Sequence, residues 1–462
     1  MPSPNPWLIT DLTPEVIKAR DGSIRTIAAQ RDGSRPTGPD APSFTLSKTD
    51  TTITATITNA QGATSYESRV GSGAWVSGLT VSGLTAETAY SFQVRGINDD
   101  GTGAASDAVS ETTNAAQSQV GVLISESFDD QPDWHSGLAQ NDKEGDGSPD
   151  RVQLAETHTV PEGVYAVRQD PEWSPSKGYP DGHETIEILA SNTDKTRNGT
   201  GKSAVFWRDS TKGEDYYRWN SDGMLTWYFA DGQTELYACF YIKFGPTWTP
   251  DGLTGTSKLF RFSHWDGTRD IYGFGSTKQN GPVAFWNYKH DSYGVRNVLA
   301  FRGHPIADNY GLGTPEPTNL PRDGVLSMNF DSNIRDLDGD GTEDNTIDSL
   351  FDLTTGEPLT GEIFNHDQIY GTSWRKMEFH VKMNSAPGVL DGVFQQWMDD
   401  NLIFRNVTMP WMGTESEGGV KWNTVSLGGN DHFHQYPDAD KRQEWYAIDD
   451  VLIRDSLPED KL

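Results

Sequence analysis

Two alternating stretches decide the fold: ELYACFYIKF at Glu235–Phe244 and MEFHVKMN at Met377–Asn384. In both stretches every second residue is apolar, and polar, aromatic or cysteine residues stand between them. A period of two places these two sets on opposite faces of a β-strand. Strands with one apolar and one polar-aromatic face suit a sandwich of two antiparallel sheets. The sequence therefore predicts an all-β fold.

The surrounding residues extend this pattern to a known family. The stretches Trp374–Asn384 and Asp391–Asp400 resemble the central strand pair of concanavalin A-like jelly rolls, closest to the polysaccharide-lyase-like members. Glu126–Asp130 and Ala447–Val451 match the first and last strands of such domains. The resemblance implies a large concanavalin A-like β-jelly-roll sandwich over residues 120–455, followed by a C-terminal tail at 456–462.

A smaller β-domain is expected upstream, at residues 43–114. The stretch TTITATIT at 51–58 alternates like a half-buried strand, and Tyr90, Phe92 and Val94 share one face of another. With Leu84 six residues before Tyr90, this resembles the tyrosine corner of a fibronectin type III domain. The resemblance implies that the Tyr90 hydroxyl binds backbone upstream. Residues 115–119 form a small, polar linker, and residues 1–42 form either a disordered leader or an anchoring arm.

Composition excludes several classes of partner. The 462 residues carry a formal net charge of −30, so binding to nucleic acid or to an anionic membrane surface through the chain as a whole is excluded. No run of about 18 apolar residues predicts a transmembrane helix. The start MPSPNPW lacks the pattern of a secretory signal peptide. Cys239 is the single cysteine, so no intramolecular disulfide forms, and its strand context predicts a small buried residue.

The strongest local motif is an acidic loop, DLDGDGTED at 336–344. Alternating carboxylates with a glycine at the sharp turn are typical of a calcium loop. The twelfth position holds Ile347 in place of a glutamate, which argues against an EF-hand, and a solvated acidic turn is the alternative. The expected ligands of a structural Ca²⁺ are Asp336, Asp338, Asp340, Thr342, Asp344 and Asp348.

A weaker copy of the same motif, DKEGDGSPD, lies at 142–150. It keeps the alternation and the glycine, so it is a second candidate for structural Ca²⁺. Its expected ligands are Asp142, Glu144, Asp146, Ser148 and Asp150.

The polar faces of the two alternating strands predict a carbohydrate-binding surface. Aromatic rings stack on the C–H faces of sugars, and amide, imidazole and ammonium groups bond their hydroxyls. An ordinary solvent-facing sheet is the alternative. The candidate residues are Tyr237, Tyr241, Lys243, Glu378, His380, Lys382 and Gln396.

A polysaccharide lyase needs a group that neutralises a uronate carboxylate and a base that removes the adjacent proton. Tyr241, His380, Lys382 and Arg261 supply the residue types, although the facing of Arg261 is ambiguous. No R-x-E-x-R strand, Q-x-H motif or paired hydrolase carboxylates are found in the sequence. The sequence therefore favours a binding module over an enzyme.

Module order leads to two functional hypotheses. The first is a structural bacteriophage virion appendage, such as a head-fibre, decoration or tail-fibre-like protein. It attaches to other virion proteins through residues 1–42 and presents the jelly roll to cell-surface or environmental glycans at the virion surface. The alternative is a calcium-stabilised polysaccharide lyase that is extracellular without a recognisable signal peptide and cleaves uronic-acid polymers by β-elimination. A homo-oligomer fits both hypotheses, but no heptad pattern indicates one.

Overall fold

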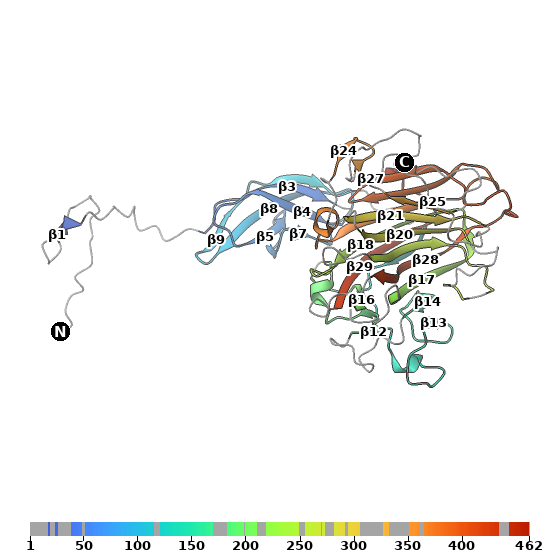
Figure 1. Cartoon of the computed structure of the whole chain (residues 1–462). Coiled ribbons are helices and arrows are strands. Elements are labelled where there is room, and N and C mark those ends of the chain that lie inside the picture. Colours follow the sequence, from blue (N-terminus) through green and yellow to red (C-terminus); the bar gives the residue numbers. More distant parts are fainter. Residues whose placement is uncertain are drawn as a thin grey trace. The chain divides into compact units, whose positions relative to one another are not determined.

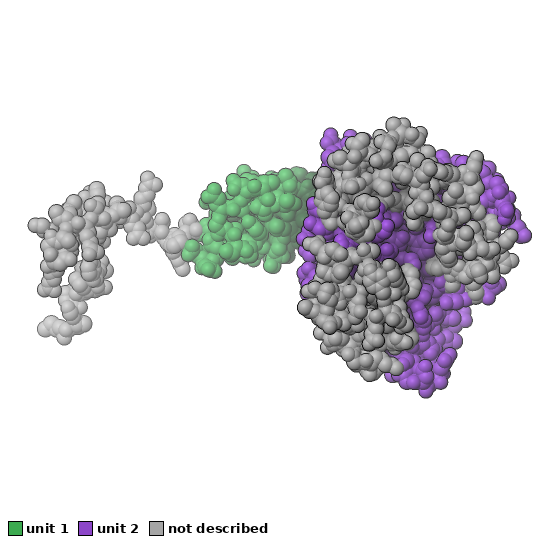
Figure 2. Space-filling view, viewed as in Figure 1, with its two compact units in different colours: residues 1–119 green, residues 120–462 purple. Residues whose placement is uncertain are grey.

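The computed structural model describes residues 17–18, 24–25, 38–48, 51–114, 121–169, 183–197, 199–209, 219–248, 255–268, 270–272, 281–291, 294–304, 327–331, 351–359, 365–433 and 443–461. The chain divides into two compact units, residues 1–119 and 120–462 (Figure 2). Antiparallel strands dominate both units (Figure 1), so the predicted all-β fold class is confirmed. No helix in the described ranges is long and apolar enough to cross a membrane.

The smaller unit is a sandwich of two short sheets. One sheet contains β3 (Ser43–Lys48), β4 (Ile53–Asn59) and β7 (Thr80–Val81). The other contains β5 (Ser65–Val70), β6 (Val76–Ser77), β8 (Ala89–Asn98), β9 (Gly101–Ala105) and β10 (Val109–Thr112). Upstream, β1 (Ile17–Lys18) pairs with β2 (Ile24–Arg25).

The core and the tyrosine corner of this unit follow the sequence pattern. Ile53, Phe92 and Val94 are fully buried between the two sheets. The Tyr90 hydroxyl accepts a hydrogen bond from the backbone N–H of Thr85 at 2.8 Å. The expected contact between the tyrosine and upstream backbone is thus confirmed.

The larger unit consists of two large antiparallel sheets. The nine-stranded sheet contains β11 (Val122–Glu126), β12 (Trp134–His135), β15 (Ile186–Ile188), β16 (Ala204–Asp209), β18 (Glu235–Phe244), β25 (Arg375–Lys382), β26 (Gly392–Met398), β27 (Asn401–Met409) and β29 (Gln443–Arg454). The eight-stranded sheet contains β13 (Val152–Leu154), β14 (Ala166–Arg168), β17 (Trp219–Gln233), β19 (Gly255–Ser263), β20 (Val283–Asp291), β21 (Gly294–Arg302), β22 (Ser327–Asp331) and β28 (Trp422–Phe433).

Short elements complete the unit: β23 (Phe351–Asp352), β24 (Glu357–Pro358), α1 (His366–Ile369), η1 (Ala139–Asn141), η3 (Thr193–Lys195) and η4 (Glu459–Lys461). The first strand of the unit, β11, pairs with the last, β29. This pairing confirms that both ends of the predicted sandwich domain belong to one sheet.

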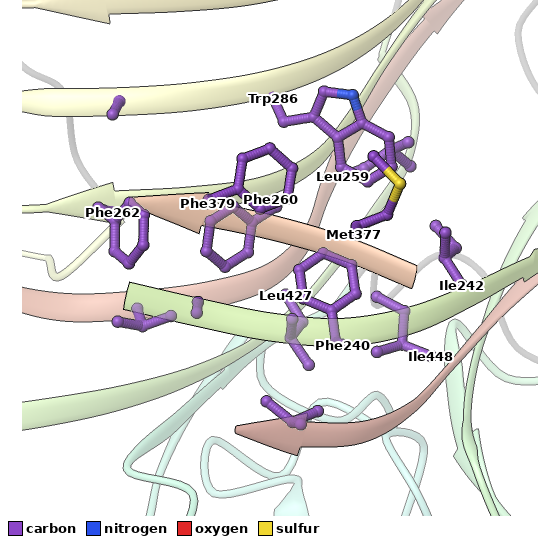
Figure 3. Close-up of a cluster of buried hydrophobic side chains, with 14 of the residues drawn as sticks. Phe240, Ile242, Leu259, Phe260, Phe262, Trp286, Met377, Phe379, Leu427 and Ile448 are labelled. Atoms are coloured by element: carbon purple, nitrogen blue, oxygen red, sulfur yellow. The ribbon is translucent and has the colours of Figure 1, made fainter. Parts of the chain in front are cut away.

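A continuous aromatic core lies between the two large sheets (Figure 3). Phe240 on β18 and Phe379 on β25 belong to the nine-stranded sheet, and Phe260 on β19 belongs to the eight-stranded sheet. Their ring centroids lie 4.7–5.9 Å apart. The apolar residues of both alternating stretches therefore face inward, as predicted, and their polar partners face outward.

A buried ion pair also connects the sheets. Arg208 on β16 donates from Nε to Glu444 on β29 at 2.7 Å and from Nη1 to Ser257 on β19 at 2.8 Å. Arg208 and Glu444 are almost completely buried. Since β19 belongs to the other sheet, Arg208 links the two layers through hydrogen bonds.

Candidate functional site

The predicted carbohydrate-binding residues meet on the outer face of the nine-stranded sheet. Strands β18 and β25 pair so that Tyr237 lies opposite His380, and Cys239 lies opposite Glu378. Cys239 is buried, as expected. Tyr237, Tyr241, Lys243, Glu378, His380 and Lys382 all belong to these two strands.

Their side chains, however, mostly bind one another. The Tyr237 hydroxyl donates to Glu378, and Glu378 also accepts from Lys461 of η4 at 3.0 Å. His380 Nε2 lies 2.9 Å from Glu235 Oε1 and its Nδ1 lies 2.9 Å from Gln395. Tyr237, Glu378 and His380 are at most 3% exposed. The centre of this face is therefore packed, and these polar groups are paired with one another.

The C-terminal segment completes this packing. The backbone N–H of Leu457 donates to Glu235 at 3.1 Å, and Lys461 also lies 2.9 Å from Asp400. The hydrogen bond from His380 is the main cause that lowers the pKa of Glu235 to about 2. A dense ion-pair network accounts for this arrangement without any ligand.

The edges of the face are less buried, but their side chains also have partners. The Arg197 guanidinium stacks on the Tyr241 ring, 3.5 Å from its centroid. Lys243 donates to the backbone carbonyl of Asp194 at 3.0 Å, and Lys382 lies 3.4 Å from Glu235. Whether these residues bind a glycan is not tested by their geometry and stays a prediction.

The facing expected for Gln396 is wrong, and Arg261, whose facing was ambiguous, lies on the other sheet. Gln396 points into the core, where its side chain exchanges hydrogen bonds with Asn297 of the opposite sheet. Gln396 pairs with inward-facing Phe379 of β25 and lies two residues after buried Phe394, so regular alternation accounts for this inward facing. Arg261 lies on the eight-stranded sheet, so it does not join Tyr241, His380 and Lys382 in one site.

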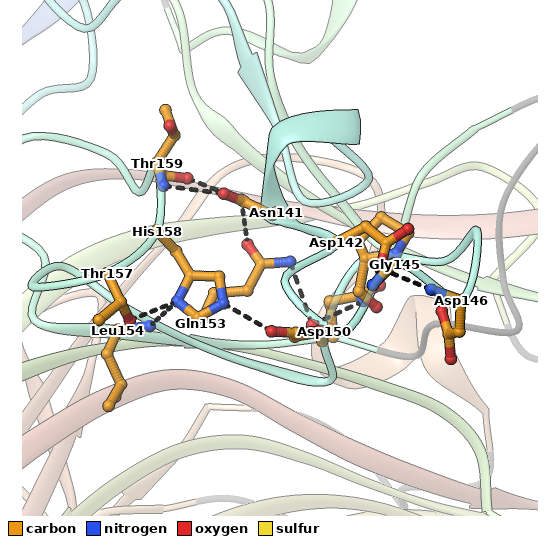
Figure 4. Close-up of polar contacts among 12 residues, drawn as sticks. Asn141, Asp142, Gly145, Asp146, Asp150, Gln153, Leu154, Thr157, His158 and Thr159 are labelled. Carbon is orange, nitrogen blue, oxygen red and sulfur yellow. Dashed lines mark hydrogen bonds and ion pairs between the residues drawn. The ribbon is translucent and has the colours of Figure 1, made fainter.

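The weaker acidic loop is described, whereas Asp336, Asp338, Asp340, Thr342, Asp344 and Asp348 lie outside the described residues. The Asp142 carboxylate accepts the backbone N–H groups of Gly145, Asp146 and Gly147 at 2.7, 3.1 and 2.8 Å (Figure 4).

The other carboxylates of this loop are also engaged. Asp150 pairs with His158 at 2.8 Å, and Asp146 accepts the Ser148 N–H at 2.9 Å (Figure 4). Glu144 is exposed. Within the described residues no three His, Cys, Asp or Glu side chains are grouped to hold a metal. Calcium therefore stays a prediction at both loops.

Cationic side chains gather on the outer face of the eight-stranded sheet, where the sequence analysis singled out Arg261 alone. Lys258 and Arg261 project from β19, and Arg168 lies at the end of β14. We call these three residues the cationic cluster. Arg261 is only 2% exposed. Burial is the main cause that lowers the pKa of Lys258 to about 8, and the charge of Arg261 is the second.

Small hydroxyl-bearing residues surround this cluster. Arg261 Nε donates to Ser426 Oγ on β28 at 3.3 Å, and Ser426 also bonds Thr226 of β17 at 2.7 Å. Lys258 Nζ donates to Asn430 Oδ1 at 2.9 Å. A Cβ at Gly429 would lie 2.6 Å from the Lys258 Cβ, so glycine lets the lysine stem lie close to β28. Because Thr226 and Ser426 are fully buried, their hydroxyls hold the Arg261 side chain in place.

Tyr272 contacts two of the three cations. Its ring centroid lies 5.2 Å from the Arg261 guanidinium carbon and 5.8 Å from that of Arg168. Asp222 pairs with Arg168 at 2.7 Å and also with Arg151. The charge of Asp270 acts on Arg261 as well. Burial holds the pKa of Tyr272 well above its usual range, so its hydroxyl stays protonated.

A β-bulge in β19 explains why the sequence pattern did not indicate this candidate site. The register of β19 shifts between Lys258 and Phe260 on both sides, which turns Leu259 and Phe260 inward together. Strict alternation therefore assigns wrong faces to residues on one side of the bulge. Arg168 belongs to a strand of three residues and Tyr272 to a loop. Neither segment is long enough or regular enough to show an alternation of apolar and polar residues.

Solved structures with related folds were found, but sequence relatives were not. No family model and no curated protein matches the sequence. An alginate lyase, Aly36B, solved as a mutant with an alginate tetrasaccharide, is 10% identical with a TM-score of 0.37. The match covers 73% of this chain and 98% of that one.

Two further matches correspond to single parts of the chain. The Emp46p carbohydrate recognition domain is 10% identical over 55% of this chain and 89% of its own, with a TM-score of 0.27. FN3tt is 28% identical over 17% of this chain and 99% of its own, with a TM-score of 0.15. These low scores carry no functional argument, so the proposals below rest on the geometry.

Proposed function

We propose that the outer face of the eight-stranded sheet binds an acidic polysaccharide through its carboxylates. The observation that carries this proposal is the cationic cluster itself. The charge of Arg261 lowers the pKa of Lys258 on the same strand, β19, and Arg261 is almost completely buried. Holding like charges together with little solvent is unfavourable, and Asp222 and Asp270 supply two carboxylates against the three cations of the cluster. A carboxylate-bearing ligand would relieve that cost.

Charge and chemistry select the class of anion. The net charge of −30 repels polyanions in general, so binding depends on a local site. Guanidinium groups recognise carboxylates by directional hydrogen bonds. Asn430, which is only partly buried and accepts from Lys258, supplies an additional partner for hydroxyl groups. A polymer rich in both carboxylates and hydroxyls, such as a polyuronate, fits this combination better than a nucleic acid.

Calorimetric titration with a polyuronate and a neutral polysaccharide tests the proposal. We expect the wild type to bind only the polyuronate, and Arg261→Gln to weaken binding at least tenfold, since charge-assisted contacts dominate such sites. Lys382→Gln, on the exposed edge of the other sheet, is the matched control and should leave affinity unchanged. Equal affinity of wild type and Arg261→Gln would refute the proposal.

A lyase is the second candidate, and the lowered pKa of Lys258 favours it. We propose that neutral Lys258 removes the proton at C5 of a uronate ring while Arg261 binds its carboxylate. The electron pair then forms the C4–C5 double bond as the C4–O bond breaks, and Tyr272 donates its proton to the departing oxygen. Absorbance of the unsaturated product tests this step. Lys258→Met should abolish it, and a wild type that binds polyuronate without forming product would exclude catalysis.

Structural calcium is proposed for the two acidic loops on sequence grounds. A chelator should lower the melting temperature of the wild type, and the double variant Asp338→Ala with Asp340→Ala should lose this response. Replacing Asp142 is a poor test, because its carboxylate already binds three backbone N–H groups without a metal. No change in melting temperature with chelator would argue against calcium in both loops.

Attachment to a virion through residues 1–42 is likewise proposed from module order alone. In this segment the structure describes residues 17–18, 24–25 and 38–42. Limited proteolysis of the free protein and of purified particles tests the role of the arm. The arm should be cleaved in the free protein and protected in the particle, and equal cleavage in both would count against an anchor.

A further inference from the structure

We propose that Tyr165, Tyr228 and Trp265, here named the aromatic trio, form a separate sugar-stacking subsite of the same surface. The inference rests on the proposed polysaccharide binding and adds a length requirement to it. The trio would take the apolar C–H face of a pyranose ring, while the cationic cluster takes a carboxylate. The ligand is then an acidic oligosaccharide long enough to reach both places.

Three separate segments bring the rings of the trio together. Tyr165 precedes β14, Tyr228 lies in β17 and Trp265 follows β19. The ring centroids are 5.0 Å apart for Tyr165 and Tyr228, 5.2 Å for Tyr228 and Trp265, and 6.0 Å for Tyr165 and Trp265. All three side chains are half-buried rather than buried. Part of this aromatic surface is therefore accessible to a ligand.

The backbone of Trp265 is held in place from both sides. Its N–H donates to Asn423 Oδ1 at 2.7 Å, and Asn423 Nδ2 donates to the Trp265 carbonyl at 2.7 Å. Asn423 is itself 6% exposed, so these bonds lie in a largely dry environment. A preformed backbone at Trp265 reduces the conformational entropy lost when a sugar binds, which favours a stacking site there.

The trio is continuous with the cationic cluster. Tyr228 pairs with Thr424 of β28, and Thr424 pairs with Ser263 of β19. Two strand spacings of about 4.8 Å therefore separate Tyr228 from Ser263. Arg261 lies two residues before Ser263 on the same strand face. Tyr272, which contacts Arg261 and Arg168, packs in the same small cluster that Tyr165 and Trp265 cover.

Local charge determines which part of the ligand contacts the aromatic trio and which part contacts the cationic cluster. Glu156 is exposed and close enough to Tyr165 that its charge raises the pKa of the phenol, after the larger effect of burial. A carboxylate beside the trio disfavours another carboxylate there and leaves the ring face of the sugar as the favourable contact. The trio and the cationic cluster thus differ in what they bind.

A length series of uronate oligosaccharides, from dimer to octamer, tests the inference by calorimetry. We expect Tyr228→Ala to bind the octamer roughly tenfold more weakly than the wild type, with dimer affinity unchanged. Tyr228→Phe keeps the ring and should bind both as the wild type does. Arg261→Gln should weaken the binding of both ligands.

The outcomes separate this inference from the proposed function. If Tyr228→Ala and Trp265→Ala keep octamer affinity while Arg261→Gln loses it, the aromatic subsite is refuted and polysaccharide binding stands. If the wild type binds no uronate of any length, both are refuted. Melting temperatures of the variants identify any loss of folding, and Tyr228→Ala carries the test if Trp265→Ala does not fold.

Discussion

At the scale of single residues, Lys258 connects the structure to a measurable pH response. Its lowered pKa of about 8 means that the free protein loses this positive charge in mildly alkaline solution. We therefore expect affinity for polyuronate to be constant below pH 8 and to fall above it. Titration of Lys258→Gln over the same range should remove the decline. A wild-type affinity that rises above pH 8 would contradict the assignment.

Glu235 gives a second residue-scale prediction, on stability in acid. Its folded-state pKa of about 2 lies below the ordinary 4.5, so it stabilises the fold above pH 4.5 and this contribution disappears as pH falls towards 2. Urea unfolding at several pH values should show the loss in the wild type. In Glu235→Gln the free energy of unfolding should depend less on pH between about 4.5 and 2. If the free energies of wild type and variant change with pH in the same way, the ion pairs of Glu235 do not stabilise the fold.

At the scale of elements, the Arg208–Glu444 pair is the sharpest test of how the sheets are joined. Arg208→Met leaves the Glu444 carboxylate buried without its guanidinium, so unfolding should become easier by about 3–5 kcal/mol. Denaturant titration measures this loss. The double variant Arg208→Met with Glu444→Met should recover part of the stability, because the Glu444 charge is gone while buried Asp431, 3.9 Å from the guanidinium, still loses that contact. A double variant no more stable than the single one would contradict this explanation.

The elements also show where sequence patterns succeed. Strand β18 occupies Glu235–Phe244, as the alternation indicates, because inward residues all meet one apolar layer. The same reasoning is wrong for strand β19, because its β-bulge changes which face of the sheet the residues around Phe260 lie on. Gln396 is a different case, because it follows buried Phe394 by two residues on β26 and alternation itself places it on the inner face. Alternation predicts strands well and predicts facing only where the ladder is regular.

At the scale of the whole molecule, each unit has a hydrophobic core of its own. Tyr90→Phe removes the hydrogen bond from Thr85 within the smaller unit and should cost it about 1 kcal/mol. Calorimetry of the full chain should show a lower melting temperature for that unit and an unchanged one for the larger unit. A shift of both transitions together would mean that the units unfold cooperatively.

The same scale explains why alternation indicated the nine-stranded sheet, whereas the site proposed from the structure lies on the eight-stranded sheet. Both sheets carry polar outer faces, and the face with recognisable alternation is the one filled by Glu235, Glu378 and η4. The cationic cluster draws on β14 and β19, while its neighbours come from β17 and β28, segments far apart in the sequence. Only the pairing of these strands brings Arg168, Lys258 and Arg261 to one face.

A crystal structure of the protein with a uronate oligosaccharide tests the central claim most directly. We predict ligand density on the outer face of the eight-stranded sheet, with a carboxylate within hydrogen-bonding distance of Arg261 or Lys258. Density instead over Tyr241, Lys243 and Lys382 on the nine-stranded sheet would contradict the account.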